Sequence, residues 1–214
     1  MSGGYSPAIY PGNQISLGQE FDGSSTSDFL KGRMDEVRIW EDDLSQEQIR
    51  RSMDVDIPVD AENLVAYYKL EPGYYVYNIT DYTSNNYHGQ HHSNPQGSHS
   101  NVITVPMPDL DYSGSTYYIS DKEDLYWLSR CVPAWDRDFR QNEDIVFDAA
   151  DFQSGGLFYH EGEGWLHVGT NSNNFEGSFD GNGNEIDGLV INRSGTNETG
   201  FFGFTNGAEI KNLK

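Results

Sequence analysis

The chain has 214 residues, of which 36% are hydrophobic and 14% aromatic, enough apolar side chain for a core and too much for a disordered protein. Its 23 glycines and 14 tyrosines favour a turn-rich β protein over a helical bundle. A net charge of −21 repels phosphate backbones, so we expect no nucleic-acid partner. The acids are scattered, which fits a solvated acidic surface, and some of them are expected to hold Ca²⁺ through carboxylate oxygens.

The first 90 residues contain short apolar runs separated by Gly, Asp and Ser. Residues 15–17 and 34–40 alternate in the manner of strands. In the second run Asp35 falls on the face of Val37 and Ile39, where a bare carboxylate would be costly. Asp35 therefore needs a charged partner, a hydrogen-bonding turn or a metal.

A short helix and another strand follow. Ser45 and Gln48 form a capping box, which predicts that the helix begins there. Residues 64–70 predict the strand, and the Pro-Gly pair that follows them ends it. Residues 91–114 lack apolar periodicity and are expected to form a linker or long loop.

The remaining residues begin with a helix and continue as short strands. Ser120 and Glu123 form a second capping box ahead of apolar residues at helical spacing. Residues 144–147 predict a strand. From about residue 165 onward, short strands are broken by Gly and Asn every few residues, as at solenoid corners that need left-handed backbone.

Residues 1–90 contain the following motifs in chain order: ISLG at 15–18, GRMDEVRIW at 32–40, Leu44-Ser45 followed by Ile49, LVAYY at 64–68 and DYTSNNYHG at 81–89. They resemble the C-terminal part of a laminin-G-like, concanavalin-A-type jelly roll. The resemblance implies a partial β-sandwich, Ca²⁺ binding and, in some members, glycan binding. The positions that match the metal ligands are Asp35 and Asp81. An ordinary Asx turn is the alternative for Asp81, because Ser84 and Asn85 follow it.

Residues 115–214 carry the strongest pattern in the chain: WLHVG at 165–169, FEGSFDGNGNEIDGLVI at 175–191, GFFGF at 200–204 and AEIKNL at 208–213. It resembles the GLUG-motif right-handed β-helix of bacterial surface proteins, with the preceding helix as its cap. The resemblance implies the capped start of a parallel solenoid. Phe175, Phe179 and Ile186 can point inward while Gly183 and Gly188 make corners, and stacked neighbours must cover each coil.

These patterns predict an all-β chain. Its parts are a partial jelly roll over 1–90, a linker or long loop over 91–114, and the cap and first coils of a β-solenoid over 115–214. The chain stops in mid-motif and begins without a signal peptide, which favours an excised fragment. No apolar run reaches transmembrane length, so no membrane span is expected.

Few residues stand out as chemical sites. Six aromatics are expected to be exposed and are the candidates for stacking on sugar rings: Trp40, Tyr67, Tyr68, Tyr74, Tyr75 and Tyr77. The last three form the best run. The alternative for that run is a strand with one packed face. The histidines His88, His91, His92 and His99 lie in a predicted loop without a converging ligand set for Zn²⁺. Cys131 is predicted to be a buried structural thiol.

No acid pair, nucleophile elbow or phosphate loop indicates catalysis. We therefore expect a non-catalytic segment of a large secreted or cell-surface bacterial adhesin or scaffold protein, with Ca²⁺-dependent binding to a glycan or surface polymer. One alternative is an accessory module of a secreted polysaccharide-active enzyme or peptidase. Another is a self-assembling extracellular filament subunit. Neighbouring domains or copies of the chain would complete the open solenoid end.

Overall fold

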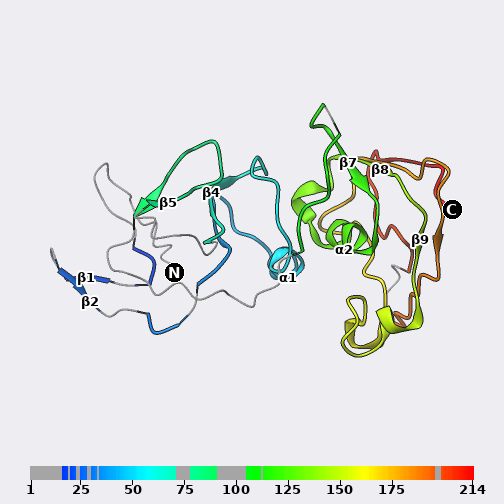
Figure 1. Ribbon diagram of the computed structural model, residues 1–214, viewed down its shortest axis with the longest axis horizontal. Coiled ribbons are helices and arrows are strands. Elements are labelled where there is room, and N and C mark those ends of the chain that lie inside the picture. The colour runs from blue at the N-terminus through cyan, green and yellow to red at the C-terminus, as the bar shows by residue number, and fades with distance from the viewer. Residues whose placement is uncertain are drawn as a thin grey trace, which may run out of the picture. The chain divides into compact units, whose positions relative to one another are not determined.

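The computed structural model describes residues 16–18, 20–22, 25–27, 30–32, 34–70, 78–90, 105–111, 113–195 and 199–214. The chain forms two compact units, Met1–Met34 and Asp35–Lys214. Across the described residues it is mostly β, with two α-helices and both antiparallel and parallel strand pairs (Figure 1). The mainly β class predicted from glycine and tyrosine content is confirmed at this level.

In the first unit, β1 (Glu20–Asp22) pairs with β2 (Ser25–Ser27) in antiparallel fashion. The strand predicted over 15–17 is wrong where the structure describes it, because Ser16 and Leu17 lie outside any strand. Gly18 explains the difference, since its φ of +78° turns the backbone at this point. The Gly18 carbonyl then accepts a hydrogen bond from the Leu30 amide at 2.7 Å.

The second unit opens with an antiparallel pair formed by β3 (Val37–Trp40) and β4 (Leu64–Tyr68), which confirms both predicted strands. Strand β3 begins after Glu36 because that residue has a φ of +50°. Between the strands lies α1 (Gln46–Ser52), and its predicted capping box is present: Gln48 N donates to the Ser45 hydroxyl at 3.2 Å, and Ser45 N to the Gln48 side chain at 2.8 Å.

A second antiparallel pair joins β5 (Asn78–Ile79) to β6 (Gly89–Gln90). After it, β7 (Thr116–Ile119) leads into α2 (Lys122–Arg130). The predicted Ser120/Glu123 capping box is wrong by one residue. Asp121 is the N-cap and accepts from Asp124 N at 2.9 Å, while the Asp124 carboxylate accepts from Ser120 N at 2.8 Å. Aspartate caps a helix as well as serine does, so the cap moves one residue along the chain and satisfies the amide of Asp124 instead of that of Glu123.

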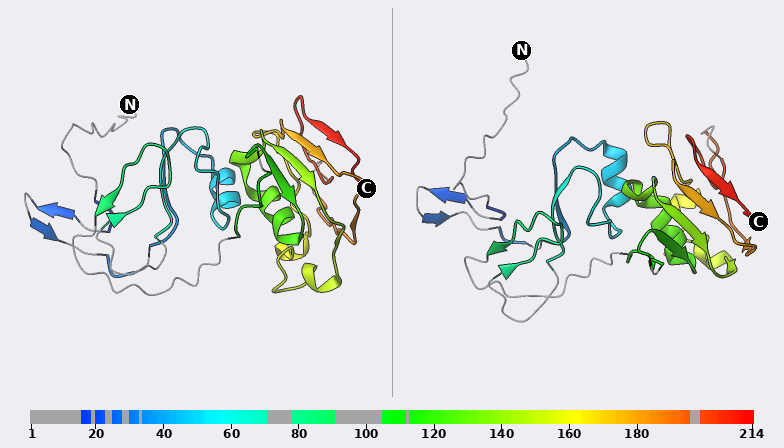
Figure 2. Two further views of the ribbon diagram at one scale, coloured as in Figure 1. Left: turned by 45° about the horizontal axis from the view of Figure 1, so that its top comes forward. Right: turned by 90° about the horizontal axis from the view of Figure 1, so that it is seen from above.

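The rest of the unit is built on parallel pairing. Strand order in the main sheet is β12-β10-β8-β7, where β8 is Asp138–Gln141, β10 Ser178–Asp180 and β12 Glu209–Lys211, and every neighbouring pair is parallel. Figure 2 shows these four strands side by side, with β12 at the outer edge. A smaller parallel pair joins β9 (Ile145–Val146) to β11 (Ile186–Asp187). Short 3₁₀ turns lie between the strands: η1 (Val132–Ala134), η2 (Ala149–Phe152) and η3 (His160–Gly162).

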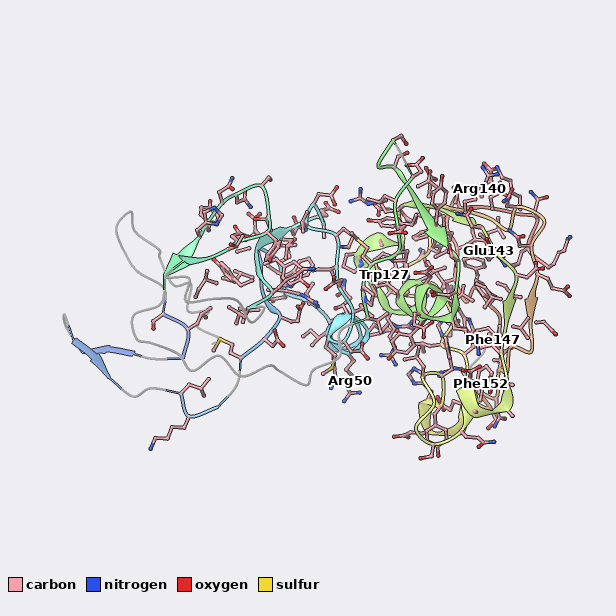
Figure 3. All side chains as sticks on the ribbon, viewed as in Figure 1. Arg50, Trp127, Arg140, Glu143, Phe147 and Phe152 are labelled. Atoms are coloured by element: carbon pink, nitrogen blue, oxygen red, sulfur yellow. The ribbon has the colours of Figure 1, made fainter. Side chains whose placement is uncertain are left out.

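Aromatic side chains fill the interior at matching positions of the parallel strands. Tyr117 of β7, Phe139 of β8 and Phe179 of β10 are in register, and all three are buried. The Tyr117 and Phe139 rings stack with centroids 5.5 Å apart. Figure 3 labels three further members of the aromatic core, Trp127, Phe147 and Phe152. The inward orientation predicted for Phe179 is therefore confirmed.

Close backbone approach also marks the stacked strands. Residue 177 must be glycine, because a Cβ at Gly177 would lie 1.9 Å from the Arg137 carbonyl oxygen. The predicted corners at Gly183 and Gly188 have φ values of +86° and +75°. Asn182 and Asn212 adopt the same left-handed region, as the repeated Gly and Asn spacing predicts.

Residues 51–56 pack against α2, so the compact second unit includes parts of all three predicted segments. The Trp127 indole donates to the Asp56 carbonyl at 2.7 Å, and the Tyr126 hydroxyl donates to Asp54 at 2.7 Å. Val55 also forms a parallel bridge with Val105, which lies within the predicted linker. The main division between units falls between Met34 and Asp35 because these contacts tie α1 to the parallel sheet region.

Candidate functional site

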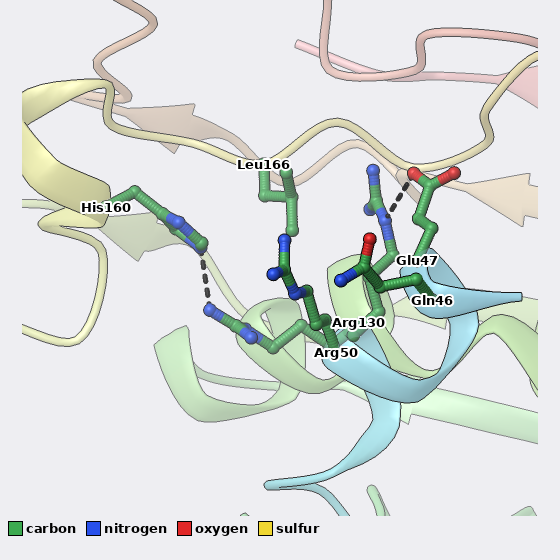
Figure 4. A pocket seen from close by; sticks show the side chains of 7 residues that line it. Gln46, Glu47, Arg50, Arg130, His160 and Leu166 are labelled. Atoms are coloured by element: carbon green, nitrogen blue, oxygen red, sulfur yellow. Dashed lines mark hydrogen bonds and ion pairs between the residues drawn. The ribbon is translucent and has the colours of Figure 1, made fainter.

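A hollow of about 280 Å³ lies where α1 meets α2, η3 and Leu166 (Figure 4). Three arginines, one histidine, one carboxylate, one amide and one leucine line it: Arg50, Arg51, Arg130, His160, Glu47, Gln46 and Leu166. We call this hollow the arginine pocket. It concentrates guanidinium groups on a chain whose net charge is −21.

Arg51 lines the arginine pocket and is only 5% exposed. Its Nη1 donates to the carbonyls of Ser129 at 2.9 Å and His167 at 3.0 Å, and its Nε pairs with Glu47 at 3.1 Å. The guanidinium also lies 5.3 Å from the ring centroid of Trp135. Arg51 is thus committed to holding α1 against α2 and against the segment that contains His167.

Arg130 closes the opposite side of the pocket by meeting His160. Arg130 Nη2 lies 2.7 Å from His160 Nε2, and since arginine only donates, this imidazole nitrogen must accept. His160 is therefore neutral, with its proton on Nδ1. Burial, followed by the positive charges of Arg130 and Arg193, lowers the pKa of His160 to about 4.

The backbone that presents His160 is strained. His160 has a φ of +39° and Glu161 a φ of +56°, so two successive non-glycine residues occupy the left-handed region. Such conformations persist where the surrounding contacts enforce them, and they gather at ligand sites. Here the hydrogen bond to Arg130 is the contact that fixes the imidazole.

Arg50 differs from its neighbours because its side chain is exposed at the pocket rim. Within the described part of the chain, no hydrogen bond or ion pair is formed by its guanidinium. Of the three guanidinium groups in the lining, that of Arg51 is paired with Glu47 and that of Arg130 with Asp54 at 3.4 Å, which leaves the charge of Arg50. The pocket therefore offers an uncompensated positive charge, with planar donors that suit an oxyanion.

A protein of Evansella cellulosilytica described as "Putative Gly-rich membrane protein" is 50% identical to this chain over 42 residues. The shared segment is short in both proteins, covering 20% of this chain and 5% of that one. No family model matches the chain, and no solved structure matches it at a significant level. None of the helices in the described residues is long and apolar enough to cross a membrane.

Asp81, one of the two predicted Ca²⁺ ligands, is 3% exposed and organises a turn. Its Oδ1 accepts from the amides of Tyr67 at 3.0 Å and Thr83 at 2.9 Å, and its Oδ2 from the Thr83 hydroxyl and the Tyr87 amide, both at 2.9 Å. Burial opposes ionisation, but these bonds outweigh it and lower the pKa of Asp81. The bond from Thr83 N is that of the Asx-turn alternative.

The other predicted ligand, Asp35, lies half-buried at the start of β3 and accepts from Glu36 N at 3.1 Å. This bond to the adjacent residue does not decide among its three predicted alternatives. The structure does not bring Asp35 and Asp81 into a common ligand set. Across the described ranges, no group of three or more His, Cys, Asp or Glu side chains converges as a metal site would need.

The predicted sugar-stacking residues Tyr74, Tyr75 and Tyr77 lie outside the described residues. Tyr67 and Tyr68, expected to be exposed, are buried, which corrects that expectation. The Tyr67 hydroxyl donates to Glu36, which also pairs with Arg38 at 2.8 Å. Glu36, just before β3, and Arg38 within it thus form an ion pair on the face of the strand that meets Tyr67.

Two other predicted groups have structural positions. Cys131 is fully buried, as predicted, and burial raises the pKa of its thiol. His88 Nδ1 accepts from Asp81 N at 3.1 Å and so helps to order the Asp81 turn. Of the remaining histidines in the predicted loop, His91, His92 and His99 lie outside the described residues.

The arginine pocket was not predicted from the sequence. The available signal was the Arg50-Arg51 pair at the end of a predicted helix, in a chain with only 13 basic residues. Arg130 ends the next helix, but nothing in the sequence indicates that two helix ends so far apart in the chain meet. Helix C-termini attract basic residues in any case, which hides the signal.

Proposed function

We propose that this chain is a non-catalytic segment of a secreted or cell-surface bacterial adhesin or scaffold protein, built on the capped start of a right-handed parallel β-helix. The observation that carries the proposal is the aligned interior column of Tyr117, Phe139 and Phe179 on successive parallel strands. Stacked identical positions of this kind are the packing unit of a solenoid. Helix α2 supplies the cap, because it packs against β7 at one edge of the sheet.

Binding rather than catalysis fits the chemistry of the arginine pocket. Its one carboxylate, Glu47, is tied to Arg51, and its one imidazole accepts a hydrogen bond from Arg130. General acid–base chemistry needs a group whose pKa lies near the working pH, and the pKa of His160 is about 4. Fixed guanidinium groups instead suit recognition of a charged polymer.

Retention on immobilised polysaccharides, measured together with product release, tests this function. The chain is passed over neutral and acidic bacterial surface polysaccharides with Ca²⁺ or EDTA, and the supernatant is assayed for new reducing ends. We expect retention without any release of reducing ends. Loss of retention in EDTA would support the predicted Ca²⁺ dependence, and polymer cleavage would reject the non-catalytic assignment.

The outer edge of β12 supports a second candidate, self-association of the solenoid. Strand β12 pairs only with β10 among the described strands, and Ile210, in register with buried Phe179, is 39% exposed. An unpaired parallel edge with an exposed apolar side chain is a template for another strand. Concentration-dependent sedimentation that Ile210→Lys abolishes would support association, and a monomer at all concentrations would reject it.

A further inference from the structure

The arginine pocket has the composition of an acidic-sugar site. Besides its guanidinium groups it contains the aliphatic side chain of Leu166 and the amide of Gln46. A sugar ring presents C–H groups that pack on an aliphatic side chain and hydroxyls that bond to an amide. The volume of about 280 Å³ is small for a drug-sized ligand and fits a single sugar residue.

Of the three arginines that line the pocket, Arg50 is the one whose guanidinium is both exposed and without a polar partner in the described residues. Arg130 is committed within the protein, because its Nη2 donates to His160 at 2.7 Å, its Nη1 pairs with Asp54 at 3.4 Å, and its Nε is buried. The charge that a ligand in the hollow can meet directly is therefore that of Arg50.

His160 keeps the pocket selective for negative charge. Its neutral Nε2 occupies one Arg130 donor and orients the guanidinium plane without adding a carboxylate to the lining. Arg193, whose charge also reaches His160, is held by Glu163 at 2.7 Å and by the Trp165 carbonyl at 2.7 Å. Arg193 therefore supports the positive field around the pocket without joining its lining.

We infer that the arginine pocket binds the carboxylate of a hexuronate residue in an acidic glycan, with Arg50 as the charged donor. Arginine matches carboxylate geometry through two parallel N–H···O bonds, and Leu166 with Gln46 recognises the attached ring. This inference names a ligand class for the proposed surface-binding role and rests on that role.

Calorimetric titration of the full chain with D-glucuronate tests the inference, with glucose and inorganic phosphate as parallel titrants. We expect glucuronate to bind with a dissociation constant on the order of millimolar, which added salt weakens, and glucose to give no saturable heat. Equal binding of glucose would overturn the role of the carboxylate. Equal or tighter binding of phosphate would replace the sugar acid by a bare oxyanion and so overturn the hexuronate assignment.

Arg50→Met is the decisive variant because this exposed side chain forms no hydrogen bond or ion pair in the described residues. We expect it to weaken glucuronate binding at least about tenfold, and Arg50→Lys to recover part of the loss as a point charge. Arg140→Met is the matched control, since it removes an exposed arginine that does not line the pocket. Unchanged binding in Arg50→Met, or equal loss in Arg140→Met, would overturn the inference.

Failure of this inference can be told apart from failure of the proposed function. Retention on polysaccharides with no glucuronate binding would reject the pocket and keep the binding role. Glucuronate binding lost in Arg50→Met, with no retention on any polymer, would keep the pocket and reject the surface-binding role. Thermal melting of each variant, followed by circular dichroism, verifies that the compared proteins are folded.

Discussion

Replacing Arg51 by methionine removes a side chain that joins α1 to both α2 and the His167 segment. Methionine retains most of the aliphatic packing on Trp135, so the change isolates the guanidinium. What is lost is two hydrogen bonds to buried carbonyls, at 2.9 and 3.0 Å, and the ion pair with Glu47 at 3.1 Å. The two carbonyls remain buried without this donor.

The expected cost follows from these contacts. A hydrogen bond from a charged donor contributes about 1.5–3 kcal/mol, but burying the guanidinium offsets part of the sum. Burial lowers the pKa of Arg51, because removing the guanidinium from water destabilises its charged form. This destabilisation is the cost that offsets part of the hydrogen-bond energy. We therefore expect Arg51→Met to lower the free energy of unfolding by about 3 kcal/mol. For a chain of this length the melting temperature should fall by roughly 6–12 °C.

Urea denaturation followed by far-ultraviolet circular dichroism measures this loss without relying on Trp135, whose fluorescence Arg51 itself would change. Arg50→Met is the matched control, because the neighbouring arginine is exposed and makes no such bonds. We expect the control to remain within about 0.5 kcal/mol of the unmodified chain. If Arg51→Met lost no more stability than Arg50→Met, the assignment of Arg51 as the link between α1 and α2 would be refuted.

Three further predictions use the same denaturation assay. Asp81→Ala should lower the free energy of unfolding by about 3 kcal/mol, because buried amides lose their acceptor. Ser84→Ala in the same turn should leave it unchanged, and equal effects of the two variants would contradict the role of Asp81 in the turn. Phe179→Ala should lower the free energy of unfolding by about 4 kcal/mol, and Ile210→Ala at the exposed edge by about 1 kcal/mol. A larger loss for Ile210→Ala than for Phe179→Ala would reject the aromatic column. The unfolded chain takes up the His160 proton near pH 6.5 and the folded chain near pH 4, so stability should fall as the pH drops through that window. His160→Gln should remove this part of the pH dependence, and an unchanged profile would contradict the neutral imidazole.

Local patterns predicted much of the fold. The capping box at Ser45, the strand at 64–68 and the left-handed corners at Gly183 and Gly188 follow from short-range rules that the structure satisfies. Where two local solutions were equally good the prediction failed, as at α2, where Asp121 caps the helix one residue after Ser120. A cap at Ser120 would satisfy the amide of Glu123 and a cap at Asp121 satisfies that of Asp124, and short-range rules do not rank the two.

The candidate site depended on contacts between distant segments and was therefore missed. Composition indicated an acidic surface, and a net charge says nothing about where the few cations gather. Arg51 reaches Ser129 and His167 only after α1 has packed on α2, and Arg130 meets His160 through a strained turn. In the same way, Tyr67 was predicted to be an exposed aromatic, because the sequence does not show that Glu36 and Arg38 contact its hydroxyl in the fold.

Disulfide trapping across β10 and β12 tests the parallel stacking on which the account rests. Ser178 is in register with Glu209, and an antiparallel arrangement about Phe179 and Ile210 would instead pair Ser178 with Lys211. Only cysteines at directly paired positions come within bonding distance, and Cys131 is too buried to compete. The account predicts rapid oxidation of the Ser178→Cys/Glu209→Cys variant and none of the Ser178→Cys/Lys211→Cys variant. The opposite result would contradict the parallel solenoid.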